Sequence, residues 1–164
     1  MRVYESDKIR NIAILGHSGS GKSNLMEAVH FTVKLTNRIS KPTDDAKLTS
    51  SMNLYSLEWR DHKYNFLDTP GYFDFVGETL SALRVAGGAV ILVDASSGIE
   101  VGTEKAWNFT EKRDMPKIIF INKMDKENVN YVKLIKDLKD TFGKKVAPFC
   151  IPIGEGAEFK GFVN

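Results

Sequence analysis

The chain has 164 residues, of which 42% are hydrophobic, and its formal net charge is +2. This length is enough to bury one sizeable core and too short for two ordinary domains, so we expect one domain over residues 1–164. Acidic and basic residues nearly balance, which gives no reason to expect DNA or a membrane as a partner. The single cysteine, Cys150, excludes an internal disulfide and a multi-cysteine zinc site. The first residues lack the apolar core of a signal peptide, and we expect a cytoplasmic protein.

Strands and helices are predicted to alternate along the chain, because short apolar runs are followed by stretches with apolar residues at helical spacing. In chain order the first elements are a strand over 9–15, a helix over 25–33, a loop over 34–48 and two strands over 49–59 and 63–67. The later ones are a helix over 76–86, a strand over 89–93, a helix over 101–113, a strand over 118–121, a helix over 131–142 and a short extended run over 146–151.

This order of elements predicts an α/β fold. Alternating strands and helices favour a mostly parallel sheet with helices on both faces, which makes three layers. The hairpin around residues 60–62 adds one antiparallel edge strand. Ligands of such sheets bind outside the carboxyl ends of the strands. The loops 16–23, 68–71 and 122–125 all follow strands, so we expect them to converge on one edge.

Residues 16–23 read GHSGSGKS and match the phosphate-loop pattern G-x-x-x-x-G-K-[ST] between a predicted strand and a predicted helix, which points to a P-loop NTPase fold. Lys22 would reach the β- and γ-phosphates and assist catalysis, and the Ser23 hydroxyl would ligate Mg²⁺. The predicted nucleotide contacts in this loop are His17, Ser18, Gly19, Ser20, Gly21, Lys22 and Ser23. A glycine-rich turn that matches by chance is the alternative, and the loop alone does not separate ATP from GTP.

A second motif, Asp68-Thr69-Pro70-Gly71, ends the extended run that follows the hairpin turn. The Asp68 carboxylate can hold Mg²⁺ through water, and the Gly71 N–H can meet a γ-phosphate during catalysis. Loss of that contact on hydrolysis would release residues 72–76, as in an order-to-disorder switch. In isolation the same four residues could form an ordinary turn.

A third motif, Asn122-Lys123-Met124-Asp125, directly follows a predicted strand. Guanine presents two adjacent donors, and an acceptor-only carboxylate at Asp125 can accept from both. Adenine would leave that carboxylate unpaired, so Asp125 favours GTP over ATP. Asn122 could tie this loop to the phosphate loop and the base, while the aliphatic part of Lys123 covers the ring. An ordinary polar turn is the alternative for this motif alone.

With all three motifs in order, the chain resembles the translational GTPases, and within them elongation factor G and its elongation-factor-G-like paralogues. The similarity runs from about residue 9 to residue 162 and includes the stretches IRNIAILGH, DTPGYFDFVGE, SALRVAGGAVILVDA, SGIEVGTEKAW, IIFINKMDKEN and PIGEGAEFKG. The resemblance implies a GTPase that docks on ribosomal RNA and proteins and couples GTP hydrolysis to translocation or a related step.

Two positions, Tyr72 and Gly19, depart from the family pattern, and a third, Thr49, is matched to it only by counting residues back from Asp68. Tyr72 stands where the family usually has a histidine that orients the attacking water, although the most similar paralogues also carry tyrosine. A phenol is a poor base near neutral pH, so Tyr72 could at most position water. Gly19 replaces an aspartate of the better-known members. Thr49 falls at the first-switch threonine that closes over Mg²⁺ and the γ-phosphate, with an ordinary strand threonine as the alternative.

The resemblance also implies that the family's last base-contacting loop and later domains lie beyond residue 164. Either residues 146–151 fill the place of the final strand, or the chain is a fragment. Three functions therefore stay open: a GTP hydrolase of translation, a guanine-nucleotide-binding fragment without independent turnover, and a small ATP-dependent P-loop enzyme. Asp125 speaks against the third.

Overall fold

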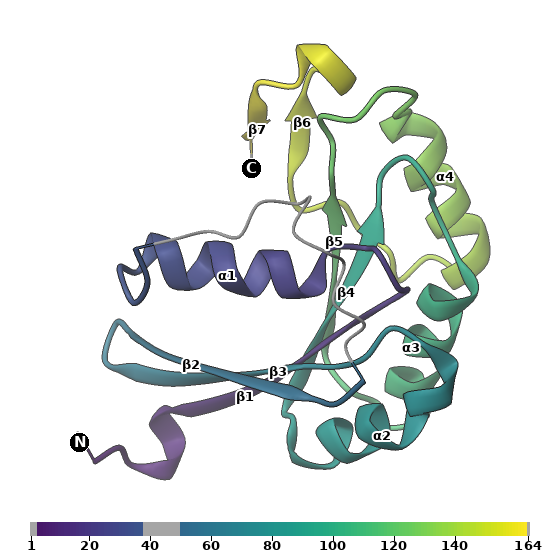
Figure 1. The fold of residues 1–164 in the computed structure, drawn as a ribbon. Coiled ribbons are helices and arrows are strands. Elements are labelled where there is room, and N and C mark those ends of the chain that lie inside the picture. The colour runs from purple at the N-terminus through teal and green to yellow at the C-terminus, as the bar shows by residue number, and fades with distance from the viewer. Residues whose placement is uncertain (1–2, 38–49, 164) are drawn as a thin grey trace.

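Five strands form the main sheet, in the order β2-β3-β1-β4-β5. The computed structural model describes residues 3–37 and 50–163 (Figure 1). The strands are β1 (Ile9–Gly16), β2 (Asn53–Trp59), β3 (His62–Asp68), β4 (Gly88–Asp94) and β5 (Lys117–Asn122). Four of them run parallel, and β2 is the antiparallel edge strand. The predicted sheet is confirmed.

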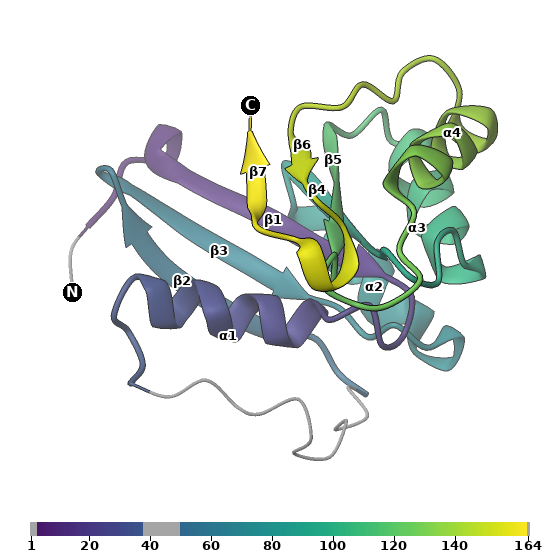
Figure 2. The same ribbon diagram turned by 90° about the horizontal axis from the view of Figure 1, so that it is seen from above.

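Helices cover both faces of this sheet, as predicted. They are α1 (Lys22–Thr32), α2 (Val76–Val85), α3 (Val101–Glu111) and α4 (Tyr131–Phe142), with 3-10 turns at Ser6–Lys8, Phe73–Phe75 and Gly156–Glu158. Because side chains alternate along a strand, Leu15 and Ile91 pack toward α2 and α3, whereas Ile14 and Leu92 pack with Met26 of α1. Figures 1 and 2 show α1 on one side of the central strands and α3 and α4 on the other.

The β2–β3 hairpin turns through only two residues. Arg60 and Asp61 both have positive φ, at 47° and 61°, which is the backbone of a tight hairpin turn whose twist matches the strands. Consequently His62, predicted to belong to the turn, pairs with Trp59 in the ladder. The strand before the turn begins at Asn53, later than the predicted residue 49.

The prediction of an extended run over residues 146–151 is wrong in extent and position. Only Ile151–Ile153 forms a strand, β6, and it pairs antiparallel with β7 (Gly161–Val163) in a separate two-stranded sheet. The main sheet ends at β5, so this segment does not supply a sixth strand. Pro148 lacks a backbone N–H and cannot donate to a ladder, which disfavours pairing of the predicted run with β5.

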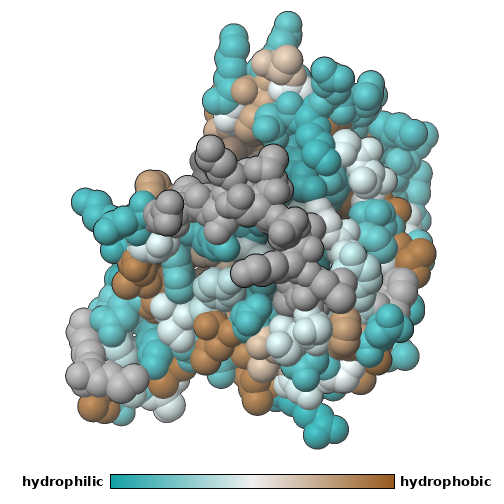
Figure 3. All heavy atoms as spheres, in the orientation of Figure 1, coloured by the Kyte–Doolittle hydropathy of each residue, from teal (hydrophilic) through white to brown (hydrophobic). Residues whose placement is uncertain are grey.

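The parallel register brings the carboxyl ends of the strands to one edge. Ile14 of β1 pairs with Asp68 of β3, and Asp94 of β4 pairs with Asn122 of β5. On the face seen in Figure 3, hydrophobic side chains are scattered among hydrophilic ones. None of the helices in the described part of the chain combines the length and the apolar character needed to cross a membrane.

Candidate functional site

The loop between β1 and α1 wraps closely against the strand ends. Gly21 has φ +96° immediately before α1, and a Cβ built on it would lie 2.4 Å from Asn122 Nδ2. Only glycine tolerates both that backbone and that approach. On the other side of the loop, His17 Nδ1 accepts from the Gly102 N–H at 3.3 Å, at the start of α3. The loop is therefore held between α3 and the end of β5.

Lys22 points its ammonium group back into this loop. Its Nζ donates to the carbonyl oxygens of Gly16 at 3.1 Å and His17 at 2.9 Å, and the residue is buried. Burial lowers the pKa of Lys22 to about 8, although the nearby Asp68 carboxylate opposes this shift. In the described part of the chain both hydrogen-bond partners of this ammonium group are neutral carbonyls, so its positive charge can attract an anionic group to the loop.

Ser23 and Asp68, which are 45 residues apart, meet below the loop. The Ser23 hydroxyl donates to Asp68 Oδ2 at 2.7 Å. Asp68 is fully buried, and its second oxygen, Oδ1, has no hydrogen-bond partner within the described ranges. Burial raises the pKa of Asp68, while the Ser23 hydrogen bond and the Lys22 charge counteract the rise. A buried carboxylate with one unpaired oxygen is costly unless a ligand satisfies it.

The segment after Asp68 lies directly against the loop. Thr69 anchors it, since both its N–H and its hydroxyl donate to the Ile14 carbonyl, at 3.2 and 2.8 Å. A Cβ on Gly71 would lie 2.6 Å from both Lys22 Nζ and Ser18 N, so glycine is required by contact. Behind this segment a small pocket opens, lined among others by Leu15, Val76, Ala106 and Phe109.

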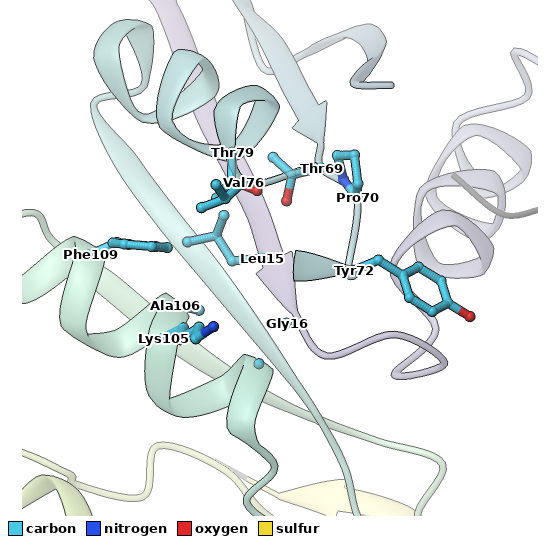
Figure 4. A pocket seen from close by; sticks show the side chains of 12 residues that line it. Leu15, Gly16, Thr69, Pro70, Tyr72, Val76, Thr79, Lys105, Ala106 and Phe109 are labelled. Atoms are coloured by element: carbon cyan, nitrogen blue, oxygen red, sulfur yellow. The ribbon is translucent and has the colours of Figure 1, made fainter. Parts of the chain in front are cut away.

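Tyr72 is the exposed end of that segment. Its side chain is half-exposed, at 47%. Figure 4 shows the ring pointing away from the other side chains that line the pocket. The phenol therefore points away from the side chains with which it lines the pocket.

The loop after β5 is tied to the loop after β1. Asn122 Nδ2 donates to the Ser20 carbonyl at 2.9 Å, and Lys123 Nζ donates to the Gly19 carbonyl. The Asp125 side chain is exposed next to these contacts. The three predicted loops thus meet at one edge, as the order of strands implied.

Asp94, at the end of β4, holds the loop after β5 from inside. Its carboxylate accepts from Lys123 Nζ at 2.8 Å, Lys126 Nζ at 3.2 Å and the Ser96 hydroxyl at 2.6 Å. Burial favours protonation, but these donors outweigh it and hold the pKa of Asp94 well below its usual value. The buried anion therefore fixes two lysines that flank Asp125.

Comparison with known proteins identifies the family of the chain that carries this site. The family model of the elongation factor Tu GTP-binding domain matches residues 7–161. The chain belongs to this family. Membership in a GTP-binding domain family implies a guanine nucleotide as the ligand, and the predicted resemblance to translational GTPases is confirmed.

Full-length relatives of this GTP-binding domain are much longer. An elongation factor G-like protein of Thermotoga maritima is 34% identical over 163 residues, which cover 95% of this chain and 24% of that protein. Elongation factor G of Petrotoga mobilis is 34% identical over 175 residues, covering 99% and 25%. A crystal structure of a protein from Thermus thermophilus matches with a TM-score of 0.85 at 35% identity, over 95% of this chain and 25% of that one. The chain spans about a quarter of the length of these relatives.

Within this GTP-binding domain, sequence reasoning missed Asp94 and could not be tested at Thr49. Thr49 lies outside the described residues. Asp94 directly follows the predicted strand 89–93, just as Asp68 and Asn122 follow theirs. A polar residue at the carboxyl end of a buried parallel strand was the available signal.

Replacing Asp94 with asparagine is expected to lower the free energy of unfolding by about 2 kcal/mol at pH 7, because the amide loses charge-assisted hydrogen bonds. The folded-state pKa is depressed, so this stabilisation is fully present above the unfolded value of 3.8 and is lost as the pH falls below it. Urea unfolding from pH 7 to pH 3 measures the difference. An equal difference at all pH values, or one matched by the exposed Asp140→Asn control, would contradict the assignment.

Proposed function

We propose that this chain binds GTP with Mg²⁺ and hydrolyses it to GDP and phosphate, as the GTPase domain of a factor acting at a ribosomal elongation or translocation step. The observation that carries the proposal is the meeting of three separate loops at one edge, with Ser23 against Asp68, Gly71 against Lys22, and Asn122 against Ser20. Each pair joins two of the predicted motifs.

The phosphates would lie on residues 16–23. Backbone N–H groups at the start of α1 and the buried Lys22 ammonium supply positive potential there. Binding would exchange the two carbonyl partners of Lys22 for phosphate oxygens, which form stronger charge-assisted hydrogen bonds. In hydrolysis Lys22 would stabilise charge on the transferred phosphoryl group.

The donors at Ser23 and Asp68 fit Mg²⁺. Both are hard oxygen ligands, they already lie 2.7 Å apart, and Asp68 Oδ1 is buried without a hydrogen-bond partner in the described part of the chain. When bound, Mg²⁺ would offset negative charge on the phosphate oxygens. Ser23 would ligate the ion, Asp68 would hold it through water, and Thr49 is a proposed third contributor through the resemblance alone.

Guanine would lie at the loop after β5. Asp125 is exposed and free to accept from the two donors of the base, while Asn122 and Lys123 keep the loop joined to the phosphate loop. The Asp94 network supports this arrangement by holding Lys123 and Lys126. If the chain bound ATP instead, adenine would not provide the two donors that the Asp125 carboxylate can accept from.

Turnover depends on how the attacking water is held. Gly71 would offer its N–H to the γ-phosphate, and Tyr72 would position water by hydrogen bonding. The outward direction of Tyr72 favours a second candidate, a guanine-nucleotide-binding domain without independent turnover (Figure 4). In both candidates the ribosome, through its RNA and proteins, is the proposed partner, which the names of the relatives support.

The test combines binding and hydrolysis. The purified chain with Mg²⁺ is titrated with fluorescent GDP, and GTP and ATP compete for it. We expect GTP to displace the fluorescent GDP and ATP not to displace it. If the folded chain binds no nucleotide, the proposal is refuted. Single-turnover hydrolysis with and without ribosomes then separates the two candidates, because only the GTPase releases phosphate.

Substituting Gly71 with alanine is expected to weaken the binding of a non-hydrolysable GTP analogue by about tenfold, whereas the binding of GDP should change less. The added Cβ would overlap Lys22 Nζ and Ser18 N, so the segment must move away from the γ-phosphate position. Competition titrations measure the ratio of the two dissociation constants. Gly77→Ala, whose Cβ meets nothing within 4 Å, serves as the control. An unchanged ratio would remove Gly71 from the proposed contacts.

A further inference from the structure

The turn that joins β6 to β7 lies on the loop that carries Asp125. The Gly156 N–H donates to the Met124 carbonyl at 2.9 Å. Gly156 has φ +58°, and a Cβ on it would lie 3.3 Å from the Lys126 carbonyl. Figures 1 and 2 both show the β6–β7 hairpin beside β5. Residues on both sides of Asp125 are therefore in contact with this turn.

The same turn holds the beginning of α4. Glu155 Oε2 accepts from the Tyr131 N–H at 2.8 Å, and the Asn130 side chain accepts from the Lys133 N–H at 2.9 Å. A carboxylate at a helix N-terminus satisfies an otherwise unpaired N–H and interacts favourably with the helix dipole. The chain from Met124 to Tyr131 is thus attached to the turn at both of its ends.

An apolar contact completes the attachment. Phe159 packs against the buried cluster that contains Val93, Met124 and Leu134. This cluster joins the end of β4, the loop after β5 and α4 under the turn. The turn cannot move away without exposing that apolar surface to water.

Asp125 itself has no comparable support. Its side chain is exposed, and its carboxylate makes no hydrogen bond within the described residues. Asp94 holds Lys123 and Lys126 on either side of Asp125, but only through the ends of their long side chains, at 2.8 and 3.2 Å. Asn122 ties the start of the loop to the Ser20 carbonyl. The main chain around Asp125 is held to the turn by Gly156, at the Met124 carbonyl, and by Glu155, at the Tyr131 N–H. We therefore expect these two residues to influence where the Asp125 carboxylate lies.

We propose that two residues of the turn Gly154–Lys160, Glu155 and Gly156, are positioning residues of the guanine site that set how well Asp125 discriminates guanine. This inference rests on the proposed function, because it assumes that Asp125 accepts hydrogen bonds from the base. Guanine donates from N1 and from its 2-amino group, whereas hypoxanthine has only the N1 donor. A displaced carboxylate loses more with guanine, so the preference for GDP over inosine diphosphate falls.

The experiment compares dissociation constants for GDP and inosine diphosphate with Mg²⁺ present, using Glu155→Ala and Gly156→Ala. Each substitution is expected to raise the dissociation constant for GDP by about tenfold and that for inosine diphosphate by less. Glu158→Ala, an exposed glutamate in the same turn, is the matched control and should behave as wild type. Glu155→Gln keeps an acceptor for the Tyr131 N–H and is expected to restore most of the preference.

The possible outcomes test the guanine site and the role of the turn separately. If the wild-type chain does not prefer GDP over inosine diphosphate, the proposed guanine site fails. If the wild type discriminates and both folded variants keep its ratio, the role of the turn is refuted and the guanine site stands. Thermal melting without nucleotide identifies a variant that does not fold. Should Gly156→Ala unfold because of its positive φ, Glu155→Ala and its Gln rescue decide the question.

Discussion

Replacing Lys22 with methionine is expected to weaken GDP and GTP binding by about a hundredfold or more. A buried ammonium that meets phosphate oxygens contributes on the order of 2–5 kcal/mol, and methionine keeps an unbranched side chain of nearly the same length without its charge. Fluorescent GDP titration with Mg²⁺ measures the loss. Lys34→Met, at a position beyond α1, is the control. Wild-type affinity in Lys22→Met would contradict the whole phosphate-loop assignment.

The same substitution is expected not to destabilise the nucleotide-free chain. Burial lowers the pKa of Lys22 from 10.5 to about 8, which means that folding disfavours the protonated lysine. The cost is fully present below pH 8 and is relieved as the pH rises from 8 to 10.5, because the unfolded chain then binds more protons than the folded one. Methionine removes that cost, so its melting temperature at pH 7 should equal or exceed the wild-type value. A large decrease would mean that Lys22 mainly supports the fold.

Replacing Asp125 with asparagine is expected to shift the preference from guanine to xanthine nucleotides. The loss for GDP should be about a hundredfold or more, because the amide N–H₂ then faces the donors of guanine and the carboxylate acceptor is gone. Xanthine carries a carbonyl in place of the 2-amino group and can accept from that amide. Competition of GDP and xanthosine diphosphate against a fluorescent probe measures both changes.

The neighbouring Glu127→Gln variant, also exposed, provides the control for Asp125. It changes an acid to an amide in the same loop and should leave the preference for guanine intact. If Asp125→Asn kept that preference, Asp125 would not contact the base, and the inferred role of Glu155 and Gly156 would fall with it.

The motifs were predicted from local sequence, and their convergence followed from one general property of parallel sheets. Residues 16–23 could be assigned because glycine spacing, a preceding apolar run and a following helical period all lie within one short stretch. The Asn122 contact to the phosphate loop was also predicted, since both loops follow parallel strands. The carboxyl ends of such strands share an edge.

Asp94 and the turn Gly154–Lys160 show where sequence reasoning stopped. Asp94 follows a buried strand, but its importance depends on Lys123 and Lys126, which reach it from the loop after β5. Glu155 and Gly156 look like ordinary turn residues until Tyr131 and Met124 are found beside them. Contacts between residues so far apart in the chain leave no periodic pattern in the sequence.

The amino-acid sequence by itself determined the strands of the main sheet, the four helices and the phosphate loop, because hydrophobic periodicity and glycine spacing act over a few neighbouring residues. Only the tertiary structure decided that Ser23 meets Asp68, that β6 pairs with β7 and leaves β5 at the edge, and that a distant turn holds the loop of Asp125. These outcomes depend on packing and hydrogen bonds between residues far apart in the chain. Several partners compete for each buried polar group, and the arrangement of the whole fold selects among them.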